Sequence, residues 1–150
     1  MPGSIDAIVQ LQQHFSVAVC TNQSGLAREL FDLNTLHEIH NKMQTAIIEA
    51  GGHPIPVYFC PHLQADHCLC RKPQPGLLHS AMQAEQIEPK QTVFIGDSDR
   101  DIEAAFRAQC TPMLVLTGNG ATALNKIELP DTHIFDDLQT AAATLIAESQ

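Results

Sequence analysis

Acidic side chains are concentrated in one short stretch of the chain. The segment 92–95 is β-branched or aromatic, ends at Gly96, and is followed by Asp97, Asp99 and Asp101. Clustered carboxylates repel one another unless a cation lies among them, and Mg²⁺ usually binds one or two protein carboxylates together with phosphate oxygens of a substrate. The stretch therefore indicates a magnesium site. The alternative is an ordinary helix N-terminus, at which acidic residues face the helix dipole.

A strand and a helix are needed to position these aspartates. The segment 92–95 predicts a buried strand. Ser98 can cap a helix in which Ile102 and Phe106 recur at helical spacing. Asp97 then lies at the carboxyl end of the strand, which is where open α/β sheets bind ligands.

A second group of reactive side chains lies in a long loop rich in Cys, His and Pro. Cys60, His62, Cys68 and Cys70 supply three thiolates and one imidazole, a set that selects Zn²⁺ in tetrahedral coordination. All four positions are filled by protein, so the site is expected to be closed and structural. His67 is a competing ligand, but it directly precedes Cys68 and would need a strained chelate. The alternative is a set of incidental cysteines on a surface loop.

The composition limits the classes of protein to which this sequence can belong. The 150 residues, 44% of them hydrophobic, suffice for one domain with a core. A net charge of −9, with eight Lys and Arg that form no long cluster, argues against nucleic-acid binding. No apolar run approaches the ~20 residues of a membrane span, and we expect no signal peptide. Five cysteines, an odd number with three close together, indicate metal binding in a reducing compartment. We expect a cytoplasmic monomer that does not contact membranes.

Helical and strand patterns alternate along the chain. Ser4 is a possible cap of the first helix, and Asp32 or Asn34 of the second. The helical patterns cover 5–11, 34–50, 76–86, 99–106 and 136–147, and the strand patterns cover 17–20, 56–59, 92–95 and 112–116. This alternation predicts a single α/β domain, 1–150, built as a three-layer, doubly wound, Rossmann-like parallel sheet.

Three segments, in this order, resemble the motifs of haloacid dehalogenase-type phosphatases. They are Cys-Thr-Asn-Gln-Ser-Gly at 20–25, Cys-Arg-Lys-Pro-Gln-Pro-Gly at 70–76 and Gly-Asp-Ser-Asp-Arg-Asp at 96–101. The cysteine-rich loop lies between the first two of these segments, which match the second and third motifs of the family. This loop is similar to that of the D-glycero-D-manno-heptose-1,7-bisphosphate 7-phosphatase group, whose relatives include histidinol-phosphate phosphatases. The resemblance implies a fold without a cap domain and hydrolysis of a small phosphorylated metabolite. Heptose bisphosphate is the expected substrate, and histidinol phosphate is the alternative.

The resemblance also implies a role for each matching position. Thr21 would bond the oxygens of the transferring phosphoryl group, and Asn22 and Gln23 would line the substrate side. Lys72 would balance the charge of the phosphate and the nucleophile, and Arg71 would contact the substrate. These roles suit phosphoryl transfer, because its catalysis depends largely on positioning and on positive charge.

The same resemblance assigns the catalytic Mg²⁺ to the acidic motif. Asp97 would hold the ion, and Asp101 would support it from the first turn of the helix. Taken separately, residues of these motifs also have interpretations that involve no catalytic role. Thr21 is then a turn hydroxyl, Lys72 a solvated surface charge and Asp101 a partner of the helix dipole.

One family motif has no counterpart in this sequence. The family carries Asp-x-Asp at the end of a central first strand, where the first Asp is the nucleophile and the second is the general acid–base. The only acid before Thr21 is Asp6, inside the first helical pattern. We therefore expect the strands at 17–20 and 92–95 to have no neighbour on one side.

The missing motif leaves the activity of this sequence open. We expect the 150-residue chain to be inactive without the nucleophile segment. The sequence is consistent with a fragment, with a natural remnant whose strands close up, or with a segment supplied by another chain. The alternative function is a catalytically dead, zinc-stabilised domain that holds a phosphorylated ligand through Thr21, Lys72 and Asp97, or that binds a protein partner.

Overall fold

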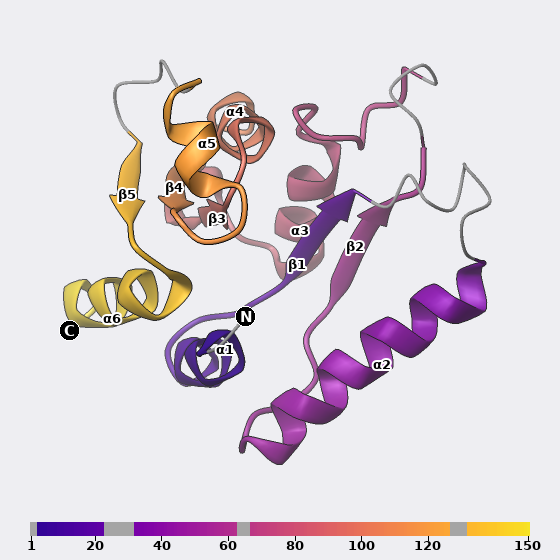
Figure 1. Ribbon diagram of the computed structural model, residues 1–150, viewed down its shortest axis with the longest axis vertical. Helices are drawn as coiled ribbons and strands as arrows, with labels where there is room; N and C mark the ends of the chain where they lie inside the picture. Colours follow the sequence, from indigo (N-terminus) through magenta and orange to yellow (C-terminus); the bar gives the residue numbers. More distant parts are fainter. Residues whose placement is uncertain (1–2, 23–31, 63–66, 127–131) are drawn as a thin grey trace.

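The computed structural model of the chain describes residues 3–22, 32–62, 67–126 and 132–150. Helices and strands alternate through these ranges, as predicted (Figure 1). Their bounds are α1 (Ser4–Gln12), β1 (Val19–Asn22), α2 (Leu33–Glu49), β2 (Val57–Cys60), α3 (Gly76–Glu85), the 3₁₀ helix η2 (Pro89–Gln91), β3 (Val93–Gly96), α4 (Asp99–Arg107), β4 (Thr111–Val115), α5 (Gly120–Leu124), β5 (His133–Phe135) and α6 (Leu138–Glu148). The α/β class is confirmed, and all strand pairs in these ranges are parallel.

The strands form two separate parallel sheets. One has the order β1-β2, with Val19 opposite Val57, and the other has the order β3-β4-β5, with Val93 opposite Thr111. Figure 1 shows β1 and β2 on one side of the molecule and β3, β4 and β5 on the other. Within the described part of the chain, β1 and β3 each have a strand partner on one side only. This confirms the expected gap between these two strands.

An apolar cleft of about 330 Å³ lies between β1 and β3. Its walls include both strands, with Leu11 of α1 and Leu145 of α6. The Val19 N–H donates to the Pro56 carbonyl and so points toward β2. Because successive residues of a strand point their backbone groups to opposite sides, those of Cys20 face the cleft. The Thr111 N–H of β4 donates to the Thr92 carbonyl, just before β3. The backbone N–H and C=O groups of Val93 and Ile95 therefore point away from β4 and face the cleft.

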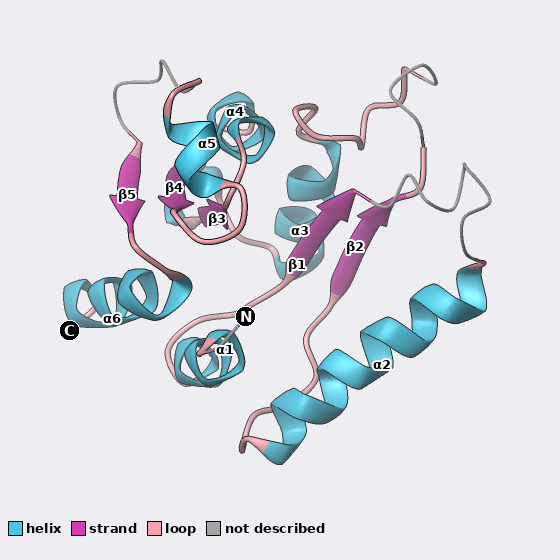
Figure 2. Cartoon of the chain, viewed as in Figure 1, coloured by secondary structure: helices cyan, strands magenta, loops and turns pink. Residues whose placement is uncertain are grey.

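Helices cover both faces of the strands, which gives the three layers that were predicted (Figure 2). Helix α3 contacts β1 and β2, and α4 contacts β3 and β4. The largest apolar cluster joins these two halves, because Cys60 of β2 and Met82 of α3 pack with Ala104 and Ala105 of α4. Helices α1 and α6 pack on one another through Ala7, Leu11 and Ala142.

Short polar side chains cap the N-termini of three helices, α2, α4 and α6. The Asp32 carboxylate accepts from the Thr35 N–H at 2.8 Å, and the Asp137 carboxylate accepts from the Thr140 N–H at 2.7 Å. The expected capping role of Ser4 is wrong, since Ser4 is the first residue of α1 and Gly3, with φ 82°, precedes it as the cap. Among the described helices, none is long and apolar enough to cross a lipid bilayer.

Candidate active site and metal cluster

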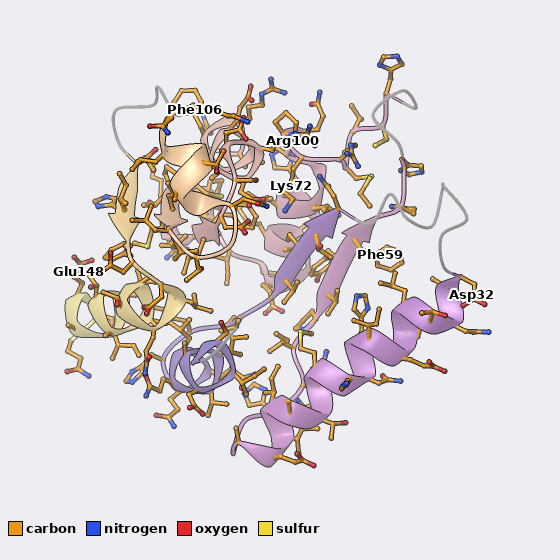
Figure 3. All side chains as sticks on the ribbon, viewed as in Figure 1. Asp32, Phe59, Lys72, Arg100, Phe106 and Glu148 are labelled. Atoms are coloured by element: carbon orange, nitrogen blue, oxygen red, sulfur yellow. The ribbon has the colours of Figure 1, made fainter. Side chains whose placement is uncertain are left out.

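The carboxyl ends of β1 and β3 open into one polar cavity of about 520 Å³. Polar and charged side chains from both sheets line it, and Figure 3 shows Lys72 beside the end of β1, with Arg100 at the same end of the molecule. The predicted residues that the structure brings together here are Thr21, Asn22, Lys72, Asp97 and Asp101. The cavity therefore joins residues of all three sequence motifs.

Lys72 is held by contacts to both sheets. Its Nζ atom lies 2.5 Å from Asp101 Oδ1 and donates to the Cys20 carbonyl at 3.2 Å. The side chains of Lys72 and Asp101 are only 12% and 8% exposed, so the ion pair is largely desolvated. The Asn22 amide fixes the Lys72 backbone, accepting from its N–H at 3.0 Å and donating to its carbonyl at 3.4 Å. The ammonium group is thereby aimed at the end of β3.

The acidic motif is ordered by hydrogen bonds to backbone N–H groups. Ser98 accepts from the Asp101 N–H at 3.2 Å and so caps α4 as predicted, and the Asp97 N–H donates to Asp101 Oδ2 at 3.1 Å. A β-carbon on Gly96 would lie 2.4 Å from the Asp101 side chain, so only glycine permits this approach. The Asn119 N–H, from the loop after β4, donates to Asp97 Oδ2 at 3.2 Å.

The structure does not bring two other predicted substrate residues, Gln23 and Arg71, to this cavity among the residues that it describes. Gln23 lies outside the described residues. Arg71 is directed toward the cysteine-rich loop, where its Nη1 atom donates to the His62 carbonyl at 3.2 Å. The Cys20 carbonyl accepts from Lys72, and burial raises the pKa of the Cys20 thiol to about 11 despite the nearby Lys72 charge. The Cys20 side chain is therefore a neutral thiol at neutral pH and a poor nucleophile.

The structure adds residues to the site to which the sequence analysis assigned no role. Asn119, Arg100 and Lys126 line the cavity, the last from the turn that follows α5. The available signal was the segment 117–120, which follows a predicted strand. The carboxyl end of that strand lies at the same sheet edge as Asp97, because β3 and β4 are parallel.

The four predicted metal ligands form one cluster. The ligand atoms of Cys60, His62, Cys68 and Cys70 all lie within 4.8 Å of one another. Cys60 Sγ is 2.8 Å from Cys70 Sγ and 3.5 Å from Cys68 Sγ, and His62 Nδ1 is 3.4 Å from both Cys60 Sγ and Cys70 Sγ. The competing residue His67 is not part of this cluster.

The cluster fits a tetrahedral zinc ion in chemistry and in size. Zinc–sulfur bonds of about 2.3 Å and tetrahedral angles place the ligand atoms about 3.5–3.8 Å apart, close to most of the observed spacings. Burial and hydrogen bonds to neighbouring thiols raise the pKa of Cys70 to about 12. Burial acts in the same direction on Cys68, but hydrogen bonds, first from the Arg71 N–H, outweigh it and lower its pKa to about 7.

Comparison with known proteins places the chain among phosphatases. Residues 69–141 match a family model described as HAD-hydrolase-like. The chain is 42% identical over 151 residues to the D-glycero-beta-D-manno-heptose-1,7-bisphosphate 7-phosphatase of Bordetella bronchiseptica, an alignment that covers 99% of this chain and 84% of that protein. It is 43% identical to the enzyme of the same name from Pseudomonas putida, over 97% of this chain and 84% of that protein.

Solved structures agree with the sequence relatives. The crystal structure of the D,D-heptose 1,7-bisphosphate phosphatase from B. bronchiseptica, complexed with magnesium and phosphate, superposes with a TM-score of 0.95 at 43% identity and covers 99% of this chain and 84% of that one. The corresponding enzyme from Burkholderia thailandensis superposes with a TM-score of 0.78 at 35% identity, over 98% of this chain and 86% of that one. The chain therefore belongs to the haloacid dehalogenase-like phosphatases, in the same family as the D-glycero-β-D-manno-heptose-1,7-bisphosphate 7-phosphatases.

Proposed function

We propose that this protein is a Mg²⁺-dependent phosphomonoester hydrolase that removes the 7-phosphate of D-glycero-β-D-manno-heptose 1,7-bisphosphate. The names of the relatives support the substrate, and the magnesium and phosphate in the B. bronchiseptica structure support the chemistry. The observation that carries the proposal is the cavity in which Thr21, Lys72 and Asp97 meet at the ends of two strands. Such an edge is the usual ligand site of parallel α/β sheets.

Asp97 is the proposed magnesium ligand. Its carboxylate lines the cavity and is oriented by the Asn119 N–H, and carboxylate oxygens are the ligands that Mg²⁺ prefers. When bound, Mg²⁺ would neutralise negative charge on the phosphoryl oxygens. Asp101 supports this arrangement from α4, because its Oδ2 atom holds the Asp97 N–H while its Oδ1 atom holds Lys72.

Thr21 and Lys72 are the proposed phosphoryl-binding residues. Charge spreads over the equatorial oxygens of a transferring phosphoryl group, so a fixed ammonium group and a hydroxyl at the strand end stabilise it. The Lys72 ammonium is already held by Asp101 and the Cys20 carbonyl, so little reorganisation is needed when the phosphate binds. Asn22 acts through Lys72, since its amide holds the Lys72 backbone.

The attacking carboxylate is proposed to come from a strand in the cleft between β1 and β3. The family mechanism needs an aspartate nucleophile at the end of a central strand. Asp6, the only acid before Thr21, lies in α1 and is absent from the residues that line the cavity. The cleft is apolar and has backbone groups of both strands facing it, as a central strand requires. The 150-residue chain alone is then expected to bind phosphate without turning over.

Zn²⁺ is the proposed ion of the Cys60, His62, Cys68 and Cys70 cluster, and its role is structural. All four tetrahedral positions are supplied by side chains, which leaves none for a substrate. Arg71 and Lys72 directly follow Cys70, and the Arg71 N–H donates to Cys68 Sγ at 3.4 Å. A rigid metal loop would thus fix the start of the segment that delivers Lys72 to the active site.

Calorimetric titration of the 150-residue chain with inorganic phosphate tests the proposed site without turnover. We expect phosphate to bind in the presence of Mg²⁺ and to bind much more weakly when Mg²⁺ is omitted. Asp97→Asn should abolish the magnesium dependence. Glu103→Gln removes the same charge from an exposed position on α4 and is the matched control. Phosphate binding that is indifferent to both Mg²⁺ and Asp97 would refute the proposed site.

A further inference from the structure

Two cations on the wall of the active-site cavity have no part in the chemistry proposed above. Arg100 comes from the first turn of α4 and Lys126 from the turn that follows α5. Together with Lys72, they place three of the eight Lys and Arg residues of this acidic chain, whose net charge is −9, around one cavity. The same wall carries the carboxylates of Asp97, Asp99 and Asp101, of which Asp97 is the proposed Mg²⁺ ligand and Asp101 is the partner of Lys72. Arg100 and Lys126 therefore remain available to an anionic ligand larger than a single phosphoryl group.

Arg100 and Lys126 are not neutralised by neighbouring carboxylates. The ion pairs found in the described ranges are Lys72–Asp101 and Arg107–Glu103, and neither includes Arg100 or Lys126. Both side chains are exposed, in contrast to the largely buried Lys72. They therefore belong to the solvent side of the cavity, whereas the largely buried Lys72 and Asp101 form its inner end.

The size of the cavity fits a whole small molecule better than one phosphate ion. Its volume of about 520 Å³ lies within the usual range for ligand pockets. A sugar bisphosphate carries two dianionic groups, and only one of them can occupy the inner position beside Lys72 and Asp97. The second group must lie elsewhere along the ligand, and unpaired cations of the outer wall are available to receive it.

We propose that Arg100 and Lys126 bind the second, non-transferring phosphate of a sugar bisphosphate and so select bisphosphates over monophosphates. This inference rests on the proposed function, because it takes the inner end of the cavity as the site of the reacting phosphate. The guanidinium fork of Arg100 can bond two phosphate oxygens at once, while Lys126 supplies a point charge. Since both side chains are exposed, their contribution is modest and falls with ionic strength.

Binding of two ligands that differ by one phosphate tests this inference on the 150-residue chain. Calorimetry with Mg²⁺ would compare D-glycero-β-D-manno-heptose 1,7-bisphosphate with the corresponding 7-phosphate. We expect the wild-type chain to bind the bisphosphate more tightly. Arg100→Gln and Lys126→Gln should each weaken bisphosphate binding about fivefold and leave 7-phosphate binding unchanged. Lys42→Gln, an exposed position on α2, makes the same charge change and should alter neither affinity.

The possible outcomes separate this inference from the proposed function. Equal affinity of the wild-type chain for the two ligands overturns the inference, although the proposed function survives if inorganic phosphate still binds with Mg²⁺. Variants that weaken both ligands equally, or a Lys42→Gln effect as large as that of Lys126→Gln, overturn it as well, because the cations then act only through net charge. Failure of inorganic phosphate and of both sugar phosphates to bind refutes the proposed function and the inference together.

Discussion

The 2.5 Å contact between Lys72 Nζ and Asp101 Oδ1 joins the two halves of the molecule at the active site. Lys72 is tied to β1 through Asn22 and the Cys20 carbonyl, and Asp101 lies in α4, directly after β3. The pair therefore spans the same two strands that flank the apolar cleft. One ion pair thus orients the ammonium group that is proposed to bind the phosphoryl group, and it fixes the spacing of the two sheets at their carboxyl ends.

Removing Lys72 should cost far more stability than removing an exposed cation. Lys72→Met leaves the Asp101 carboxylate, which is 8% exposed, without its partner, so we expect the free energy of unfolding to fall by about 3 kcal/mol. Arg107→Met breaks the exposed pair with Glu103, and its effect should stay within about 1 kcal/mol. Urea unfolding measures both. Equal losses for the two variants would show that the Lys72–Asp101 pair does not hold the sheets together.

The cleft between β1 and β3 should be visible in amide hydrogen exchange. The N–H groups of Cys20, Val93 and Ile95 face the cleft, whereas those of Val19 and Phe94 point toward the neighbouring strands. Because an N–H without a strand partner is less protected, the first three should exchange faster than the last two. NMR-detected exchange on the 150-residue chain provides the measurement. Uniform protection across β1 and β3 would mean that the two strands close up into one sheet in solution.

Filling that cleft should stabilise the protein. Covering apolar side chains and unpaired backbone groups is favourable, so the same chain carrying an added central strand ahead of Met1 should melt at a higher temperature. The cleft-facing amides of Cys20, Val93 and Ile95 should then become as protected as their neighbours. A control strand with prolines at alternate positions cannot complete the ladder and should give no increase. The same melting temperature with both strands would contradict the interpretation of the cleft.

The cysteine cluster should hold about one zinc ion per chain. Cys70→Ser removes a ligand atom that lies 2.8 Å from Cys60 Sγ, and the purified variant should lose its zinc and melt at a lower temperature. Cys110→Ser is the matched control, because that buried thiol lies outside the cluster, near Met82. Elemental analysis and thermal melting with and without a chelator give the readout. Full zinc content in Cys70→Ser would show that this residue is not a ligand.

Two helix caps should make stability depend on pH. Hydrogen bonds from the N–H groups of Thr35 and Thr140 lower the pKa of Asp32 and Asp137. Since each pKa is lower in the folded state, the stabilisation is complete above the unfolded value of about 3.9 and is lost as the pH falls through the folded value. Urea unfolding between about pH 2 and pH 6 should show a weaker pH dependence for Asp32→Asn/Asp137→Asn than for the wild type, because Asn still caps but does not titrate. An unchanged slope would contradict this assignment.

The sequence predicted the helices and strands that have a regular pattern of apolar residues, and it missed the short elements that have none. Helices α2, α3, α4 and α6 lie close to their expected ranges, because each has a long apolar face. The first strand, expected at 17–20, runs from Val19 to Asn22, since periodicity does not say which residues pair with β2. Strand β5 has only three residues, of which Ile134 is 48% exposed, and α5 has five, so neither carries a usable pattern.

In the candidate site, the sequence motifs predicted some of the residues, whereas other contacts are set by the tertiary structure and were not predicted. Motif order and residue chemistry were enough to predict that Thr21, Lys72 and Asp97 lie in one site, as they do in the structure. The orientation of Arg71 toward His62 could not be foreseen, because the local path of the metal loop sets it. The contact from Asn119 to Asp97 uses a backbone N–H, and no side-chain pattern marks such a donor. Arg100 and Lys126 meet in one cavity only because β3 and β4 are parallel neighbours.

Phosphate release from D-glycero-β-D-manno-heptose 1,7-bisphosphate tests the central claim most directly. The assay, with Mg²⁺, compares the 150-residue chain with the same chain carrying a central strand that ends in Asp-x-Asp ahead of Met1. We predict release by the extended chain, and none by the 150-residue chain or by the extended chain with Asp97→Asn. A folded, zinc-loaded extended chain that releases no phosphate would contradict the proposed activity and favour a phosphate-binding domain. Release by the 150-residue chain alone, purified free of other phosphatases, would contradict the assignment of the nucleophile.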